Sequence, residues 1–275
     1  MFVYDILWST VNIASLATLA AAAWAVAAVL MLALWWWHLR LRNAGVVDVG
    51  WAAGLALVSL LYAVFAPGDP RRRWLSAALV AIWSARLVAY LLRDRVLGRP
   101  EDPRYQHLRQ SGSIAAAASF FAFFQAQAML VVVLSTPMLI ASANPAPAWS
   151  ALEIGAALLW AAALAGETMA DRQLERFKAR RPRPESTCRD GLWRYSRHPN
   201  YFFEWLVWVA YALYALGSPG GLVALSAPAI VLYLLFRVTG IPATEAQALR
   251  TRGDDYRRYQ QATSVFVPWP PRRAS

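Results

Sequence analysis

The 275-residue sequence contains few of the residues that build disulfide frameworks or metal centres. Its single cysteine, Cys188, excludes an intramolecular disulfide and a cysteine-rich metal site. The three histidines, His38, His107 and His198, are widely separated, and no His-x-x-x-His spacing occurs. We therefore predict that the chain binds no metal.

Motifs of several large enzyme classes are also missing. There is no Gly-x-Gly-x-x-Gly run and no Walker A run, so the common glycine-rich phosphate loops are absent. No Gly-x-Ser-x-Gly occurs, and serine hydrolase chemistry is therefore not supported. A cleaved signal peptide is not expected, because the N-terminus has no basic region and the first apolar run is too long.

What the sequence has in excess is apolar surface and arginine. Hydrophobic residues make up 59% of the chain and the mean hydropathy is +0.36, too apolar for an ordinary soluble domain. The net charge of +11 comes from 26 arginines and Lys178, in short blocks between the apolar runs. This pattern indicates membrane topology and anionic ligands rather than nucleic-acid binding. We expect an all-α polytopic membrane protein.

Seven transmembrane helices are predicted, with about 20 residues as the length that spans hydrocarbon. The expected spans are 11–37, 46–66, 74–92, 114–141, 149–170, 201–217 and 221–240. The short Gly-Ser-Pro-Gly-Gly turn at 217–221 makes the last two an antiparallel hairpin. We expect a single membrane domain, residues 1–275, whose cytosolic amphipathic tail is 241–275.

The loops predict the orientation. With the N-terminus outside, 22 of the 27 Lys and Arg residues lie on the inner side, and only Arg71, Arg72 and Arg73 lie on the outer side. The positive-inside rule then places the N-terminus outside and the C-terminus in the cytosol, which requires an odd number of spans.

Polar side chains are densest in 191–205, the sequence GLWRYSRHPNYFFEW. Glu204 would enter a membrane helix, where an ionisable residue needs a partner or a cavity, so this stretch is a candidate functional site. A basic anchor for lipid headgroups is the simpler alternative. That alternative needs only the arginines and leaves Asn200, Tyr201 and Glu204 unexplained.

Two other inner-side elements complement this stretch. Residues 171–178 extend the fifth helix beyond the membrane and place Asp171, Glu175 and Lys178 on one face, until the Arg-Arg-Pro-Arg-Pro run at 180–184 ends it. The tail is expected to form an amphipathic helix pinned to the membrane by the apolar run 265–269. The three elements offer arginines for phosphate, carboxylates for ribose, and aromatic rings for stacking, which suits a nucleotide-type cofactor.

The early helices offer two further candidates. Asp48, near the start of the second helix, caps that helix, pairs with Arg86 or acts in catalysis. Tyr90 lies four residues after Arg86 on the same helical face, as an interfacial aromatic residue or a proton donor.

The block 191–205, with its Arg-His-Pro-Asn-Tyr core, resembles the signature of steroid 5α-reductase-like membrane proteins, specifically their bacterial branch of unassigned function. Similar blocks of that branch are Asn43 with Val47-Asp48, Arg99–Tyr105, Asp171–Leu174 with Phe177-Lys178, and Tyr256 and Tyr259 with Phe266–Trp269. The resemblance covers essentially the whole chain. Sterol reductases and isoprenylcysteine carboxyl methyltransferases carry a similar core element.

The resemblance implies an NADPH-dependent reductase of the bacterial inner membrane. Its cofactor would lie in a cytosol-facing cavity, and its partner would be a lipid or sterol-like enone that enters from the membrane lipids. Residue by residue, it assigns the cofactor pocket to Asp171, Lys178, Tyr195, Arg197, His198, Asn200, Tyr201, Glu204, Arg237, Glu245 and Tyr256. Asp48 and Tyr90 become the catalytic candidates, and no nucleic-acid or protein partner is expected.

Two features depart from the family pattern. The second helix has no Gln-Glu pair of the kind that the steroid enzymes use, so the resemblance does not extend to the residues of steroid turnover. Phe203 stands where glycine is usual before the glutamate and is expected to narrow the pocket.

An S-adenosylmethionine-dependent methyltransferase of a lipid is the first alternative, and a non-enzymatic scaffold is the second. Nine basic residues between 172 and 197 favour a dinucleotide, because S-adenosylmethionine carries no phosphate.

Overall fold

The computed structural model describes residues 13–98, 100–101, 105–106, 113–180, 183, 185–238 and 240–272. Within these ranges the regular structure is helical, with no β-strand. Helices suit the composition, because a chain in hydrocarbon must satisfy its backbone hydrogen bonds internally. The chain forms two compact units, residues 1–149 with 215–224 and residues 150–214 with 225–275.

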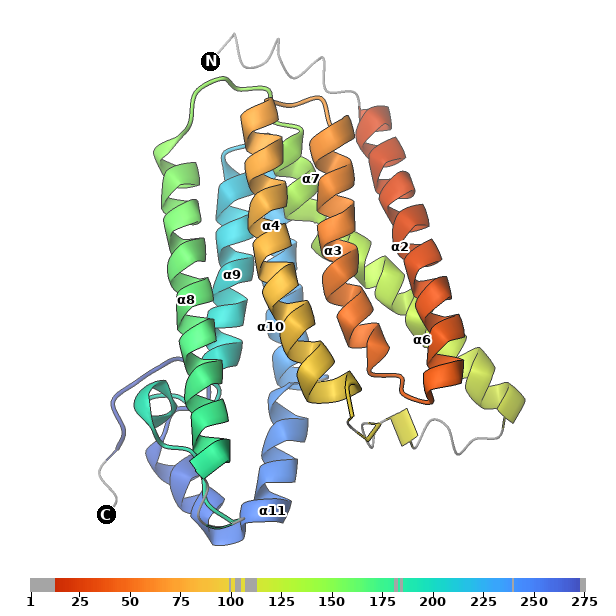
Figure 1. Ribbon diagram of the computed structural model, residues 1–275. Helices are drawn as coiled ribbons and strands as arrows, with labels where there is room; N and C mark the ends of the chain where they lie inside the picture. The colour runs from red at the N-terminus through yellow and green to blue at the C-terminus, as the bar shows by residue number, and fades with distance from the viewer. Residues whose placement is uncertain are drawn as a thin grey trace. The chain divides into compact units, whose positions relative to one another are not determined.

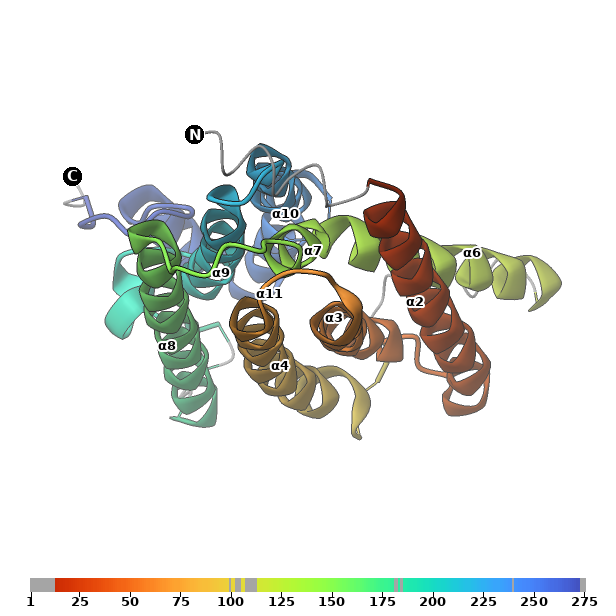
Figure 2. The same ribbon diagram turned by 90° about the horizontal axis from the view of Figure 1, so that it is seen from above.

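The first unit contains four long helices. They are α2 (Ile13–Leu41), α3 (Val46–Phe65), α4 (Pro70–Leu91) and α6 (Ser113–Leu134), with a π-helical turn, η1 (Leu92–Val96), after α4 and a short α7 (Thr136–Ser142) after α6. Helix α3 packs against both α2 and α4, and α2 packs along α6 (Figures 1 and 2).

The core of this unit is apolar with a few paired hydroxyls. Leu55 on α3, Trp83 on α4 and Phe124 on α6 are fully buried. The hydroxyls of Tyr62 and Ser135 lie 3.0 Å apart and satisfy each other across the helices. Such pairing matters because a buried hydroxyl without a hydrogen bond costs about 1–3 kcal/mol.

Helix α4 begins with a carboxylate cap. Asp69 accepts hydrogen bonds from the backbone N–H of Arg71 and Arg72, at 3.0 and 3.4 Å, and Pro70 occupies the first turn. Burial alone would raise the pKa of Asp69, but the hydrogen bonds and charge of Arg71 outweigh it and lower the pKa. The loop expected between the second and third spans therefore ends in a defined cap.

The second unit consists of α8 (Ala151–Arg180), the 3₁₀ turn η2 (Gly191–Arg194), most of α9 (Pro199–Leu216), α10 (Ser226–Arg237) and α11 (Ile241–Ala262). A further 3₁₀ turn, η3 (Gly221–Leu225), precedes α10. Indole hydrogen bonds join its helices: Trp160 donates to the Tyr211 hydroxyl at 3.0 Å, and Trp205 donates to the Pro228 carbonyl at 3.1 Å.

Six helices of the described chain are long and apolar enough to cross a membrane, which confirms an all-helical membrane protein. They are Ile13–Leu41, Val46–Phe65, Pro70–Val96, Ala117–Ser142, Ala151–Arg180 and Gly221–Ala262. The last is 42 residues long, and its acidic residues all follow Arg237, so we take α11 as a polar continuation outside the apolar part.

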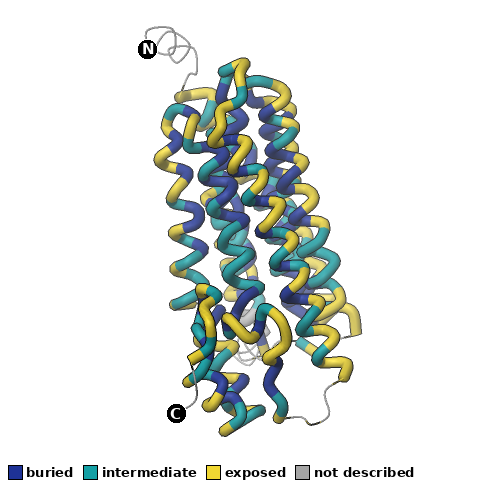
Figure 3. The backbone as a smooth tube through the Cα atoms, turned by 90° about the vertical axis from the view of Figure 1, so that its left-hand side faces the viewer, coloured by how far each residue is buried: buried dark blue, intermediate teal, exposed yellow. Residues whose placement is uncertain are grey.

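The predicted sixth span corresponds to α9, which is not among these six. Its first two turns hold Asn200, Tyr201 and Glu204, which lower its hydropathy. The predicted fourth span is divided at Ser135 into α6 and α7, because Pro137 cannot donate a backbone hydrogen bond. The fifth continues to Arg180, as predicted. Buried and exposed residues alternate along these helices (Figure 3).

Candidate functional site

The segment before α9 is fixed to α8 by a tight turn. Gly191 has φ 55°, and a Cβ there would lie 2.2 Å from Nε2 of Gln173. The Gln173 carbonyl oxygen accepts from the Leu192 N–H at 2.9 Å, and the Trp193 indole donates to the Ala170 carbonyl at 2.9 Å. Glycine is required here because positive φ and close approach coincide. The turn therefore sets where residues 195–198 begin.

The tail beyond α11 lies along the same segment. Arg197 N–H donates to the Ser264 carbonyl at 2.8 Å, and the Ser196 hydroxyl donates to the Phe266 carbonyl at 2.7 Å. Phe266 is buried, with its ring centroid 5.5 Å from that of Phe202 and 5.2 Å from that of Phe236. The prediction that this apolar run is a membrane pin is thus wrong for Phe266, which packs within the protein.

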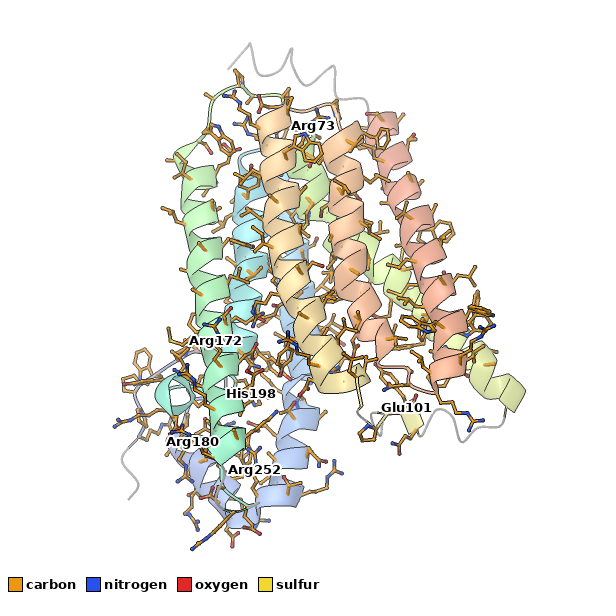
Figure 4. All side chains as sticks on the ribbon, in the orientation of Figure 1. Arg73, Glu101, Arg172, Arg180, His198 and Arg252 are labelled. Carbon is orange, nitrogen blue, oxygen red and sulfur yellow. The ribbon has the colours of Figure 1, made fainter. Side chains whose placement is uncertain are left out.

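A polar cluster forms where this segment meets α11. Glu245 Oε1 accepts from Arg197 Nε at 2.6 Å, lies 3.3 Å from His198 Nε2 and accepts from the Tyr256 hydroxyl at 3.3 Å. Its other oxygen accepts from Gln260 at 2.9 Å. The Arg197 and Glu245 side chains are 12% and 16% exposed. The structure therefore brings four of the predicted cofactor residues together (Figure 4 labels His198).

The cluster is electrostatically matched. Burial alone would raise the pKa of Glu245, but the hydrogen bonds from His198 and Arg197 and the charge of Arg197 lower it to about 2. Arg197 also donates from Nη1 to the carbonyls of Gln260 and Thr263, at 2.9 and 3.0 Å. The carboxylate is thus charged at neutral pH and holds the guanidinium in one orientation.

The two tyrosines near the end of α11 are buried within the protein. Tyr256 and Tyr259 are buried, with ring centroids 5.8 Å apart. The Tyr259 hydroxyl reaches the carbonyls of Trp193 and, at 3.1 Å, of Ser196. Burial is the largest cause that raises the pKa of both phenols. Tyr259 therefore fixes α11 to the η2 turn and to Ser196.

One face of α9 carries the second polar group. Asn200 donates from Nδ2 to the buried Asp171 of α8 at 3.3 Å. Four residues later on the same face, Glu204 accepts from the Trp208 indole at 2.9 Å. Asp171 and Asn200, both of them predicted cofactor residues, are therefore joined by a hydrogen bond.

Phe203 lies on α9 against α8. A Cβ at Gly166 of α8 would lie 2.5 Å from the Phe203 ring, so the ring fills space that this glycine leaves. Phe203 therefore packs closely against α8 at Gly166.

The aromatic pair His198 and Tyr201 borders the cluster. Their rings are stacked, with centroids 5.4 Å apart and planes at 8°. The Tyr201 hydroxyl lies 3.3 Å from that of Thr244, at the start of α11. The pair thus links α9 to α11.

Three predicted cofactor residues lie at the surface. Lys178 is exposed near the end of α8, and Tyr195 is 40% exposed while its backbone carbonyl accepts from Trp269 N–H at 2.9 Å. Arg237 is exposed at the end of α10.

The catalytic candidates belong to the first unit. Asp48 forms an ion pair with Arg95 in η1, and the Tyr105 hydroxyl donates to it at 3.4 Å. The hypothesis had named Arg86 as the partner. Tyr90 is half-buried on α4.

The resembling blocks at 43–48 and 99–105 also meet. Asn43 donates to the Arg95 carbonyl at 3.1 Å, and the backbone N–H of Ala44 donates to Glu101 at 2.8 Å. Figure 4 labels Glu101 in this connection. Arg99 and 102–104 lie outside the described residues.

The sequence analysis did not predict the hydrogen bonds that join α11 to the loop that follows α8. Asp255 accepts from Thr187 N–H at 2.9 Å and from Arg189 at 2.8 Å. Burial alone would raise the pKa of Asp255, but the hydrogen bond from Thr187 and the charge of Arg189 lower it. No local signal marks this pairing, because its partners are far apart in sequence. Gln260 was missed for the same reason.

Within the described residues, no group of three or more His, Cys, Asp or Glu side chains could hold a metal ion.

Comparison with protein families gave one match, over residues 34–263, to the family described as "Protein of unknown function (DUF1295)". Searches of curated proteins and of solved structures gave no match. The match includes the polar side chains of α8, α9 and α11 described above. The chain therefore belongs to the DUF1295 family, a steroid 5α-reductase-like membrane family.

Proposed function

We propose that this protein is a membrane-embedded NADPH-dependent reductase that acts on the C=C bond of a hydrophobic enone, sterol-like or another lipid. The observation that carries the proposal is the convergence of charged groups within the second unit. Asp171 of α8 bonds to Asn200 at the start of α9, and Arg197, just before α9, bonds to Glu245 of α11. The proposal includes seven spans, an outside N-terminus, a cytosolic C-terminus and a location in the bacterial inner membrane.

The donor set fits a dinucleotide. Arg197 uses Nε and Nη1 within the cluster, while its Nη2 donates to none of the described residues and remains available to a phosphate oxygen. Asn200 uses its Nδ2 to bond Asp171, which leaves its side-chain oxygen as an acceptor for a ligand. Asp171 supplies a carboxylate of the kind that binds ribose hydroxyls. The arginines of the loop that follows α8 favour the additional phosphate of NADPH.

NADPH, when bound, supplies the hydride. The role of Arg197, His198 and Glu245 is to present a guanidinium that is already oriented before a ligand arrives, which reduces the entropy lost on binding. Asp48, held by Arg95 and Tyr105, and Tyr90 are the groups we assign to holding and delivering a proton at the substrate carbonyl oxygen.

A lipid methyltransferase that uses S-adenosylmethionine is the second candidate. One observation favours it: most donors of Arg197 are already used within the protein, so the cluster offers fewer cations than the arginine count implies. The same observation would suit a scaffold, in which the cluster serves only to fix α11.

Thermal unfolding of the detergent-solubilised protein distinguishes the three candidate functions: reductase, methyltransferase and scaffold. A ligand at about 100 times its Kd stabilises the folded state by about 2.7 kcal/mol, and about 1 kcal/mol corresponds to roughly 2–4 °C for a chain of this size. We expect NADPH to raise the Tm by about 5–10 °C and S-adenosylmethionine to have no effect. A shift with S-adenosylmethionine alone would favour the methyltransferase, and no shift with either would favour the scaffold.

Arg197→Lys provides the site control. It keeps one charge but loses the fork of donors, so we expect the NADPH shift to fall. Arg257→Lys changes an arginine of α11 that is 68% exposed and pairs with Asp254, outside the cluster, and we expect it to leave the NADPH shift intact.

A further inference from the structure

An open groove of about 750 Å³ runs along α8, and the nine residues that line it all belong to that helix. Its apolar part is lined by Trp160, Leu164, Ala165 and Met169. The Trp160 indole N–H is already bonded to Tyr211, so the ring presents only apolar surface to the groove. Thr168 likewise donates its hydroxyl hydrogen to the Leu164 carbonyl at 2.7 Å. This part of the groove therefore suits hydrocarbon.

The other end of the groove is cationic. Arg172 and Arg176 lie one helical turn apart and are exposed, and neither guanidinium bonds to a described residue (Figure 4 labels Arg172). Gln173 stands between them, and its carbonyl oxygen is used by the Leu192 N–H, so its Nε2 is the free end of the amide. Arginine forks and an amide donor are groups that bind phosphate oxygens.

The dimensions match one leaflet of a bilayer. From Trp160 to Arg176 the helix rises about 24 Å, at about 1.5 Å per residue. Half the hydrocarbon thickness is about 15 Å, and each headgroup region adds roughly 5–8 Å. The groove thus extends from headgroup level toward the bilayer midplane.

We propose that this groove binds one anionic phospholipid, with its acyl chains along Trp160–Met169 and its phosphate held by Arg172, Gln173 and Arg176. The site is distinct from the proposed cofactor site, because Arg172 is turned about 100° around α8 from Asp171, which bonds to Asn200. A free phosphate would use only the cationic end and would leave the apolar groove unfilled. The proposal does not depend on the reductase activity.

Lipid affinity of the purified protein in mixed micelles tests this site. Phosphatidylglycerol and phosphatidylcholine with identical acyl chains are titrated, and bound lipid is counted by native mass spectrometry. We expect phosphatidylglycerol to be preferred about tenfold or more. Each arginine near an anionic headgroup contributes about a fivefold effect, so Arg172→Gln with Arg176→Gln should weaken phosphatidylglycerol about 30-fold and phosphatidylcholine little.

The matched control is Arg250→Gln with Arg257→Gln, which removes the same charge from exposed positions on α11 that do not line the groove. We expect it to change the affinity less than about threefold, since exposed charges that do not touch the lipid are screened by salt. An equal loss in the control pair would show a general charge effect and overturn the proposal. The proposal would also be overturned if the Arg172→Gln, Arg176→Gln variant bound phosphatidylglycerol as tightly as the wild type does.

Two further experiments distinguish binding of the acyl chains from binding of the phosphate group. Ala165→Trp should fill the groove and abolish retention of phosphatidylglycerol while both arginines remain; undiminished retention would contradict the site. Inorganic phosphate at millimolar concentration should not displace the lipid, and full displacement would identify an anion site instead. Arg172→Lys with Arg176→Lys keeps the charge and should retain most of the affinity, which shows that the glutamine pair is not simply misfolded.

Discussion

The ion pair of Arg197 with Glu245 makes the sharpest prediction, through Glu245→Gln. The substitution keeps the shape of the side chain but removes the charge that faces a guanidinium only 12% exposed, 2.6 Å away. A surface pair contributes about 0–1 kcal/mol, and breaking a fully buried pair costs about 3–5 kcal/mol. At this intermediate burial we expect a loss of about 2 kcal/mol in the free energy of unfolding.

The assay is thermal unfolding in detergent at pH 7, followed by intrinsic fluorescence. A loss of about 2 kcal/mol lowers the Tm by roughly 4–8 °C. Asp254→Asn is the matched control, because Asp254 lies on the same helix and pairs with Arg257 at the same kind of distance, 2.8 Å. Both of those side chains are largely exposed, so we expect a change within about 0.5 kcal/mol.

Equal Tm values for Glu245→Gln and the wild type would refute the reasoning, since they would mean that the cluster contributes nothing to the folded state. A Glu245→Gln protein that unfolds at the wild-type temperature but fails to bind NADPH would place the residue in ligand recognition alone.

Three other perturbations test the surroundings of the cluster. The pKa of Glu245 is lowered from about 4.5 to about 2, so its stabilisation is present above pH 4.5 and is lost as the pH falls toward 2; the wild-type Tm should drop more steeply over that window than the Glu245→Gln Tm. Phe266→Ala should lower the free energy of unfolding by about 3 kcal/mol and make the tail sensitive to protease. Trp269→Ala, at a side chain that is 68% exposed, should leave the free energy of unfolding and the protease resistance unchanged. Gly191→Ala should cost more than about 2 kcal/mol, since it adds a clash with Gln173 to the strain of positive φ. Gly220→Ala, with φ 68° and open space around its Cβ, should cost only about 1 kcal/mol, and equal Tm values for the two variants would contradict the close approach of Gln173 to Gly191.

The helical membrane class could be predicted from the sequence because apolar length is a local property. Val46–Phe65 and Ala151–Arg180 were expected almost as they occur, including the polar extension that carries Asp171. The limits of local reasoning appear at α9, where Asn200 and Glu204 lower the hydropathy of a segment expected to span, and at Ser135, where Pro137 follows a break in the helix.

The site could be predicted only as a set of residue types. Arg197, Glu245 and Asn200 were identified through the resemblance, but the pairing that joins Arg197 to Glu245 links residues 48 positions apart, and no periodicity encodes it. Asp48 was assigned a partner on its neighbouring helix, Arg86, although the π-helical turn at Leu92–Val96 supplies Arg95. The buried position of Phe266 could not be predicted, because composition alone does not distinguish an apolar anchor from an apolar core residue.

The tail that runs beside residues 195–198 has a consequence for biosynthesis. Arg197 depends on the Thr263 carbonyl, which is 66 residues further along the chain, so its surroundings cannot be complete while a ribosome is still making α10 or α11. Every helix of the second unit must already be in place before the last set of contacts closes over Ser196 and Phe202. A nascent chain halted before Phe266 would therefore expose aromatic surface on α9 and α10, which offers quality-control proteases a ready means of telling unfinished molecules from finished ones.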